Sequence, residues 1–171
     1  MQTYELPFES KDDPRWKLLE ACQTMLNAAR DQDRIIEIVR TTARNVLSAD
    51  GVTFVLRDYS NCHYVEEDAI TPLWKGQRFP MTNCISGWAM MNNKTAVIPD
   101  IFRDDRIPHD VYRKTFVKSL VMAPVGFDTP MAAIGAYWRD KPMISPREVK
   151  AVETIAGLIS EAMRRMRGVA A

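Results

Sequence analysis

The chain has 171 residues, of which 46% are hydrophobic, and its 23 basic and 22 acidic residues leave a formal net charge of +1. A chain of this length buries roughly 70% of its unfolded surface, which is enough for one compact domain without disulfide bonds. Because the opposite charges are interspersed, they create no one-sided field that attracts nucleic acid or an anionic membrane, and we expect neither as a partner.

The cysteine content and the apolar runs indicate a compartment. Cys22, Cys62 and Cys84 are odd in number and follow no framework spacing, which is typical of a reducing environment. The chain has no basic amino-terminal segment followed by an apolar run, and no run near the roughly 20 apolar residues that a membrane span requires. We therefore expect a cytoplasmic protein without direct membrane contact.

The amino-terminal part is predicted to be helical after a polar start. Residues 1–13 are mostly polar, and we interpret them as a flexible lead-in to a single domain over residues 14–171. Apolar residues recur at helical spacing over residues 16–29, which predicts a helix of about four turns. Asp31 is placed to cap a second helix, whose apolar stripe extends over residues 35–46.

A β-hairpin and an irregular segment are expected next. Residues 51–57 alternate Val52, Phe54 and Leu56 against Thr53 and Val55, which predicts a strand. Residues 58–61 are rich in turn formers, and residues 62–66 continue as a second strand. Residues 70–80 contain two prolines and a glycine, so we expect this segment to cross one end of the sheet without regular structure.

Shorter elements are predicted in the middle of the chain. Asn83 is placed to cap a helix that begins at Ile85 or Ser86. Residues 96–98 have the composition of a short strand, and residues 109–116 that of a helical segment.

Two strands and a long helix complete the chain. Residues 119–125 and 131–138 are predicted strands, and the second is apolar on both sides, which is typical of a central strand that is covered on both faces. Residues 145–148 combine a capping serine, a proline and the reciprocal glutamate of a capping box, which sets the start of the last helix.

The last helix has an apolar seam whose members recur at alternating steps of three and four residues. We expect part of this seam to pack on the sheet and the rest to pair with the same helix of a second subunit, forming a homodimer. The candidate interface residues are Val152, Ile155, Ile159, Ala162 and Met166.

The order of elements predicts an α+β fold. A central antiparallel sheet should have the first, second and last helices on one face and shorter helices and loops on the other. Several phrases carry a family resemblance: Ala49-Asp50-Gly51-Val52, Pro72-Leu73-Trp74-Lys75-Gly76, Cys84-Ile85-Ser86-Gly87-Trp88-Ala89, Val97-Ile98-Pro99-Asp100, Lys118-Ser119-Leu120-Val121-Met122-Ala123-Pro124-Val125 and Ala133-Ile134-Gly135-Ala136-Tyr137.

In this order the phrases resemble GAF domains, of the type found in bacterial sensor histidine kinases and related signalling proteins, over roughly residues 16–166. The resemblance implies a PAS-related fold, dimerisation through the terminal helices, and a pocket between the sheet and residues 74–91 and 98–116. The residues expected to line this pocket are Trp74, Cys84, Trp88, Ile98, Asp100, Phe102, Tyr112, Phe116, Met122 and Tyr137.

The identity of any ligand or cofactor stays open. Large rings of this kind either line an apolar pocket or fill it, so a cavity closed by its own side chains is an equal alternative. The aspartate of the cyclic-nucleotide signature is missing, and the Cys62-His63 pair, which resembles a bilin attachment pair, lies on a strand rather than a helix. The cysteines and histidines also lack the close paired spacing of structural zinc, and we expect no metal site.

The function expected from these observations is a non-catalytic sensory or regulatory domain of a bacterial signal-transduction protein, which binds a small effector or relays a signal through its terminal helices. One alternative is a structural dimerisation module with a collapsed pocket. Another is a redox enzyme of the methionine-sulfoxide-reductase type, although the sequence gives no reason for Cys62 and Cys84 to meet. Cys84, at the start of a helix whose dipole lowers a thiol pKa, is either a redox sensor or a packed cysteine.

Overall fold

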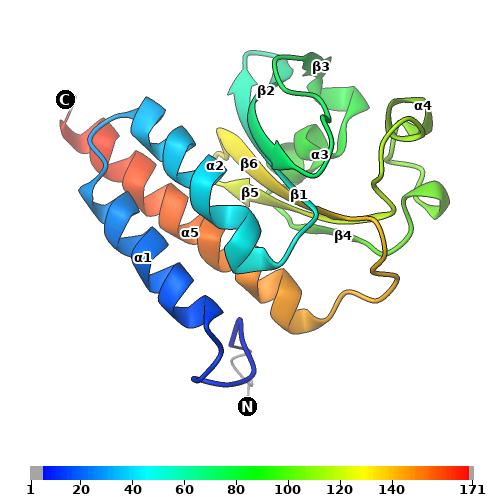
Figure 1. Cartoon of the computed structure of the whole chain (residues 1–171). Helices are drawn as coiled ribbons and strands as arrows, with labels where there is room; N and C mark the ends of the chain where they lie inside the picture. The colour runs from blue at the N-terminus through cyan, green and yellow to red at the C-terminus, as the bar shows by residue number, and fades with distance from the viewer. Residues whose placement is uncertain (1–5, 170–171) are drawn as a thin grey trace.

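The computed structural model describes residues 6–169 and contains one six-stranded sheet with the strand order β3-β2-β1-β6-β5-β4 (Figure 1). Every neighbouring pair of strands is antiparallel. The strands are β1 (Gly51–Asp58), β2 (Asn61–Ala69), β3 (Arg78–Pro80), β4 (Ala96–Ile98), β5 (Ser119–Val125) and β6 (Ala132–Trp138). The helices are α1 (Arg15–Ala28), α2 (Gln32–Leu47), α3 (Ile85–Asn92), α4 (His109–Tyr112) and α5 (Pro146–Val169), with short 3-10 helices η1 (Met81–Asn83) and η2 (Ile101–Arg103).

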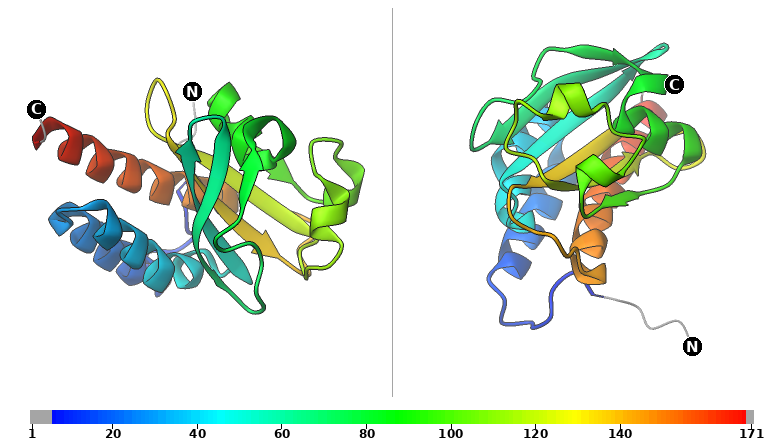
Figure 2. Two further views of the ribbon diagram at one scale, coloured as in Figure 1. Left: turned by 90° about the horizontal axis from the view of Figure 1, so that it is seen from above. Right: turned by 90° about the vertical axis from the view of Figure 1, so that its right-hand side faces the viewer.

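Helices cover the two faces of the sheet unequally. The long helices α1, α2 and α5 lie together on one face, and α3, α4 and their connecting loops lie on the other (Figures 1 and 2). This arrangement confirms the predicted α+β fold with the terminal helices on one face. Strand β6 lies between β1 and β5, and each of its residues is buried, as its apolar composition predicts.

The sheet separates two hydrophobic cores, because successive side chains of a strand point to opposite faces. On β5, Val121 and Ala123 belong to the core under the long helices, whereas Leu120 and Met122 belong to the core under α3 and α4. We call these the helix-side core and the pocket-side core. Both cores therefore rest on the same strands, separated only by the backbone of one sheet.

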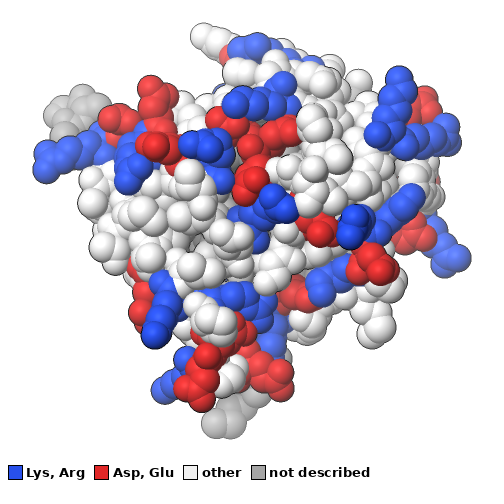
Figure 3. Space-filling model, viewed as in Figure 1, with Lys and Arg blue, Asp and Glu red and all other residues white. Residues whose placement is uncertain are grey.

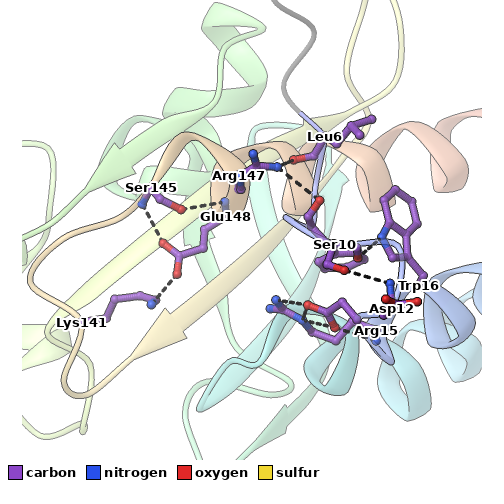
Figure 4. Close-up of polar contacts among 11 residues, drawn as sticks. Leu6, Ser10, Asp12, Arg15, Trp16, Lys141, Ser145, Arg147 and Glu148 are labelled. Atoms are coloured by element: carbon purple, nitrogen blue, oxygen red, sulfur yellow. Dashed lines mark hydrogen bonds and ion pairs between the residues drawn. The ribbon is translucent and has the colours of Figure 1, made fainter.

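The segment before α1 packs against the beginning of α5 (Figure 4). Phe8 is buried, and the centroid of its ring lies 5.1 Å from that of Trp16 in an edge-on arrangement. The Arg147 guanidinium donates hydrogen bonds to the carbonyl oxygens of Leu6 and Phe8 at 3.3 and 3.2 Å. The Trp16 indole also donates to the Ser10 carbonyl oxygen at 2.8 Å. Residues 6–13 are thus more closely attached than the flexible lead-in that the sequence predicts, and residues 1–5 lie outside the described residues.

Two predicted helix caps are present. The Asp31 carboxylate accepts a hydrogen bond from the backbone amide of Arg34 at 2.8 Å, which caps α2. At the start of α5, the Ser145 hydroxyl accepts from the amide of Glu148 at 3.3 Å, and the Glu148 carboxylate accepts from the amide of Ser145 at 2.7 Å (Figure 4). This reciprocal pair is the predicted capping box, and Lys141 adds an ion pair to Glu148.

Other local predictions are corrected. The residue at the cap position of α3 is Cys84, whereas the Asn83 side chain accepts a hydrogen bond from Thr82. Helix α4 ends at Tyr112, and the segment predicted to be irregular ends in strand β3, which pairs with the beginning of β2. These short elements depend on sheet contacts distant in sequence, which local composition does not encode.

The predicted dimer seam is also corrected. Val152, Ile155, Ile159 and Ala162 are buried within one chain, where they pack in the helix-side core, and Met166 is half-buried against the same core. The fully buried members of the seam cover the sheet and α2 of their own chain, so they cannot at the same time contact a second subunit. Between residues 6 and 169, no helix is both long enough and apolar enough to cross a membrane.

Candidate functional site

The pocket-side core contains most of the predicted site residues. Trp74, Cys84, Ile98, Tyr112, Met122 and Tyr137 belong to it, and Trp88 and Phe116 pack against it while remaining half-buried. Asp100 and Phe102 lie elsewhere, because both are exposed at η2, where they border a surface hollow. The structure therefore brings the other predicted residues together in one core and leaves these two outside it.

Aromatic rings meet at the centre of this core. The centroid of the Trp74 ring lies 4.7 Å from that of Tyr112, 5.5 Å from Tyr137 and 5.7 Å from Tyr64. Such distances are typical of favourable edge-on or tilted ring pairs. We call Tyr64, Trp74, Tyr112 and Tyr137 the aromatic cluster, and all of them are buried.

The aromatic cluster fills the space that a ligand would need. The cavity beside it measures about 10 Å³ and is lined by Tyr64, Trp74, Phe79, Cys84, Pro108, Val111 and Tyr112. One water molecule requires roughly 10–15 Å³. Of the two alternatives for these rings, the structure therefore has the one in which the side chains close the cavity.

Neutral hydroxyl groups provide the buried polar contacts of the site. Thr53 and Tyr137 share a hydrogen bond of 2.8 Å between their hydroxyl oxygens, and Tyr64 and Ser86 share one of 2.9 Å. Burial raises the pKa of the Tyr64, Tyr112 and Tyr137 phenols above the ordinary value, so these groups stay uncharged at neutral pH. A ligand in this position would meet ring faces and uncharged donors and acceptors.

Glu67 holds the segment that carries Trp74. Its carboxylate accepts hydrogen bonds from the backbone amides of Leu73, Trp74 and Lys75 at 2.7, 2.8 and 2.6 Å. Glu67 is the middle one of three consecutive acidic residues, Glu66 to Asp68, and such a run by itself is typical of a solvated strand end. A signal for the actual role exists in the strand alternation, since Glu67 pairs with Thr53 of β1, whose side chain also faces the pocket-side core.

The loop before α4 covers another side of the site. The Arg106 guanidinium lies 4.3 Å from the ring centroid of Trp88 and forms an ion pair of 2.7 Å with Asp104. The hydrogen bonds from Arg106 lower the pKa of the Asp104 carboxyl, which therefore stays ionised. Arg106 thus attaches this charged loop to α3 through Trp88.

Helix α3 approaches η1 so closely that only glycine fits at position 87. A Cβ atom there would stand 1.9 Å from the carbonyl oxygen of Met81. This contact fixes the position of the loop between η1 and α3, and with it the side chain of Cys84. The glycine of the predicted phrase therefore has a packing role at the site.

Cys62 and Cys84 are brought into the same core, contrary to the sequence expectation. Both side chains are buried there, and the Cys84 sulfur accepts a 3.4 Å hydrogen bond from the Ser86 hydroxyl. The hydrogen bond from Cys62 lowers the pKa of Cys84, whereas the same contact and burial raise the pKa of Cys62. The pairing of Cys62 with Phe79 across β2 and β3 brings the two segments together. The sequence did not reveal this contact because β3 was not predicted.

Within residues 6–169, no group of three or more histidine, cysteine or acidic side chains is arranged to hold a metal ion. A hollow of about 730 Å³ opens on the surface between η2 and the segment after β6. Its lining residues are Ile98, Pro99, Asp100, Phe102, Arg103, Asp104, Lys118, Arg139, Asp140, Lys141 and Pro142.

Known structures share this fold. The chain is similar to free methionine-R-sulfoxide reductase from Neisseria meningitidis, solved in complex with its substrate, with a TM-score of 0.79, 13% identity and coverage of 99% of each chain. It is also similar to the GAF domain of the phosphoenolpyruvate-protein phosphotransferase from Acinetobacter, with a TM-score of 0.76, 11% identity and coverage of 93% of this chain and 98% of that chain.

A third similar structure is the phycoerythrobilin-bound GAF domain from a cyanobacterial phytochrome, with a TM-score of 0.76, 16% identity and coverage of 91% of this chain and 96% of that chain. No curated protein matches the sequence. A sequence model of the GAF domain family matches residues 29–164, which is most of the chain. The resemblance drawn from the sequence phrases is thereby confirmed, and the chain belongs to the GAF domain family.

Proposed function

We propose that this chain is a sensory or regulatory domain of a bacterial signal-transduction protein, in which a small effector or a neighbouring domain acts on the aromatic cluster and changes the packing of the terminal helices. The observation that carries the proposal is the shared sheet. Met122 and Tyr137 face the pocket-side core, whereas Val121 and Ala136, directly beside them in the chain, are buried under the long helices.

Specific contacts support coupling between the two faces. Tyr137 binds Thr53 on the pocket side, and the next residue, Trp138, donates from its indole to the carbonyl oxygen of Ser48 at the end of α2 at 3.0 Å. Because packed cores transmit small displacements, a shift of the Tyr137 ring moves the backbone that also holds Trp138. An effector changes the output only through different affinities for two arrangements of the helices.

The chemistry of the site favours a small, flat and largely apolar effector with few polar atoms. An effector can enter only if Trp74 and Tyr112 separate, because their rings close the cavity beside the aromatic cluster, which we call the chamber. The groups then available are ring faces and the neutral hydroxyls of Thr53, Tyr64 and Ser86. No cofactor is assigned, since these groups suit many ring compounds.

We also propose that the protein forms a homodimer through its terminal helices. This dimer would use a face of the helices other than the apolar seam of α5. Because the seam of α5 is buried within the chain, the contact must use outward residues such as Leu18 of α1, which is 42% exposed. The face shown in Figure 3 has both signs of charge interspersed, which favours neither nucleic acid nor a membrane as a partner. We place the protein in the cytoplasm.

The experiment is native mass spectrometry of the protein purified from its own host. We expect a mass above that of the chain, which returns to the chain mass on denaturation. Gly135→Ala should abolish retention, because the new Cβ would stand 2.6 Å from the Tyr137 hydroxyl oxygen, whereas Gly157→Ala, whose Cβ meets nothing within 4 Å, should not. The bare chain mass, together with no change in thermal stability across a library of small ring compounds, would contradict effector binding.

A redox enzyme is the second candidate, because Cys62 and Cys84 lie in the same buried core and the fold is similar to that of a free methionine-R-sulfoxide reductase. The filled chamber weighs against it, since a substrate needs space beside the sulfur. Reduction of free methionine sulfoxide with dithiothreitol as reductant is the test. Turnover that disappears in Cys84→Ser would favour this candidate over a purely regulatory domain.

A further inference from the structure

We infer that Cys62 and Cys84 form a peroxide-reactive dithiol, in which a small hydroperoxide oxidises Cys84 and Cys62 then closes a disulfide between β2 and the segment before α3. The inference concerns a modification site and goes beyond the proposed function, because it needs no effector in the chamber. Its basis is the fold, which buries two thiols from different elements in one core beside a small opening and places the Ser86 hydroxyl oxygen 3.4 Å from the Cys84 sulfur.

The fold brings the two sulfurs together by way of β3. Cys62 pairs with Phe79 in the β2–β3 ladder, and after β3 the chain turns through η1 and returns to Cys84. The Cys84 thiol lies 3.5 Å from the carbonyl oxygen of Pro80 and 3.4 Å from the hydroxyl oxygen of Ser86. Both cysteines belong to the pocket-side core, so their side chains share one face of the sheet.

The two thiols differ in their readiness to ionise. The hydrogen bond from Cys62 lowers the pKa of Cys84, the Ser86 hydroxyl and the amide of Gly87 act in the same direction, and burial opposes them. The pKa of Cys62 is raised, so Cys62 keeps its proton and donates it to the Cys84 sulfur. Since the thiolate is the nucleophile, Cys84 is the sulfur that reacts first.

The size of the opening beside the Cys84 sulfur determines which oxidants can reach it. Cys84 is 7% exposed and lines the cavity of about 10 Å³ together with Phe79 and Tyr112, whereas Cys62 is fully buried. A space the size of one water molecule admits hydrogen peroxide after a small movement of these rings. Bulky oxidants such as oxidised glutathione do not fit, so the site discriminates by size.

The chemistry has two steps. An electron pair of the Cys84 thiolate attacks one peroxide oxygen, the O–O bond breaks, and a sulfenic acid forms while hydroxide leaves and becomes water on taking a proton. Sulfur is oxidised by two electrons and the peroxide is reduced. Cys62 then loses its proton, and its sulfur attacks the Cys84 sulfur. The S–S bond forms as the S–O bond breaks, and the departing hydroxide takes the proton to give a second water.

The new bond would also change the aromatic cluster. A disulfide brings the two sulfurs to about 2.05 Å and turns the Cys84 thiolate, which accepts the hydrogen bond of Ser86, into an uncharged and weaker acceptor. Ser86 is the hydrogen-bond partner of the Tyr64 hydroxyl. Oxidation thus acts on a ring that contacts Trp74 directly, at 5.7 Å between centroids.

The experiment treats the folded full chain with hydrogen peroxide and maps its cysteines by mass spectrometry. We expect a linked Cys62–Cys84 peptide pair, and in Cys62→Ser an oxidised Cys84, detected as the mass of one or more added oxygen atoms on its peptide. Cys22 is the internal control, because it is buried in the helix-side core and burial raises its pKa. Cys84 should react at least about tenfold faster than Cys22.

Three results would overturn the inference. These are an unmodified Cys84 when another cysteine is oxidised, equal rates at Cys84 and Cys22, and equal rates with hydrogen peroxide and oxidised glutathione. Circular dichroism before and after treatment verifies that oxidation occurs in the folded protein. Because the wild-type chain is mapped directly, the result does not depend on whether Cys62→Ser folds.

Discussion

Replacing Ile155 and Ile159 together with lysine is expected to unfold this domain. Both side chains are fully buried in the helix-side core, where α5 meets the sheet and α2. An unpaired ammonium group in such a site is among the most destabilising of single changes, at more than about 4 kcal/mol. The combined cost of two such groups is therefore comparable with the whole free energy of unfolding of a typical domain, which is about 5–15 kcal/mol. Circular dichroism and urea denaturation measure the outcome.

The matched control places a lysine on the same helix at a solvent-facing position. Gly157 is exposed, and a Cβ there meets no atom within 4 Å, so Gly157→Lys should fold with equal or greater stability, since lysine is the better helix former. An intermolecular seam makes the opposite prediction for the double variant, namely a folded monomer. A folded Ile155→Lys, Ile159→Lys protein would therefore contradict the intramolecular core described here.

Trp74→Ala is expected to lower the free energy of unfolding by about 3–5 kcal/mol and to open the chamber. The Trp74 ring touches the rings of Tyr64, Tyr112 and Tyr137 and is 4% exposed, so its removal leaves an apolar space with preformed walls. Engineered apolar cavities of this kind bind small aromatic compounds. Indole at ten times its Kd should restore about 1.4 kcal/mol, measured by urea denaturation with and without the compound.

Trp88→Ala is the control for this prediction. Trp88 is half-buried and stacks under Arg106 at the surface of the same core. Its removal should cost no more than about 2 kcal/mol and create no enclosed space, so indole should have no effect. Equal stabilisation of both variants by indole would show that the compound binds elsewhere, and the assignment of a closed chamber around Trp74 would be wrong.

Much of the fold was predictable because its signals are local. The Asp31 cap and the capping box at Ser145 follow from residue types at fixed spacing, and both form as predicted. Strand β6 was recognisable as central because a strand buried on both faces has no polar alternation. The order of these elements, together with the family phrases, was enough to specify the antiparallel sheet with its terminal helices on one face.

The incorrect predictions concern residue patterns that are compatible with two different ways of packing. An apolar seam on a helix has the same sequence pattern whether it packs on the sheet of its own chain or on a second subunit. In this chain, Ile155 and Ile159 pack in the core of their own chain. Aromatic residues likewise line or fill a pocket according to their rotamers, and here Trp74 and Tyr112 fill it. Composition and spacing contain no information on that choice.

The site contacts that sequence reasoning missed are long-range ones. Glu67 belongs to a run of three acidic residues that is typical of a solvated strand end, although its carboxylate accepts a hydrogen bond from the backbone amide of Trp74. Cys62 and Cys84 meet only because β3 pairs with β2, and a strand as short as β3 has no periodicity to detect. Each contact joins segments whose proximity the fold creates.

The central claim is that the aromatic cluster and the terminal helices are coupled through the shared sheet. Methyl NMR of the Trp74→Ala variant during an indole titration tests it most directly, because chemical shifts report local packing rather than global stability. We expect the methyl signals of Ile134 and Ile155, in the helix-side core, to move in the same titration as those of Ile85 and Ile98 in the pocket-side core. Shifts confined to Ile85 and Ile98 would contradict the coupling.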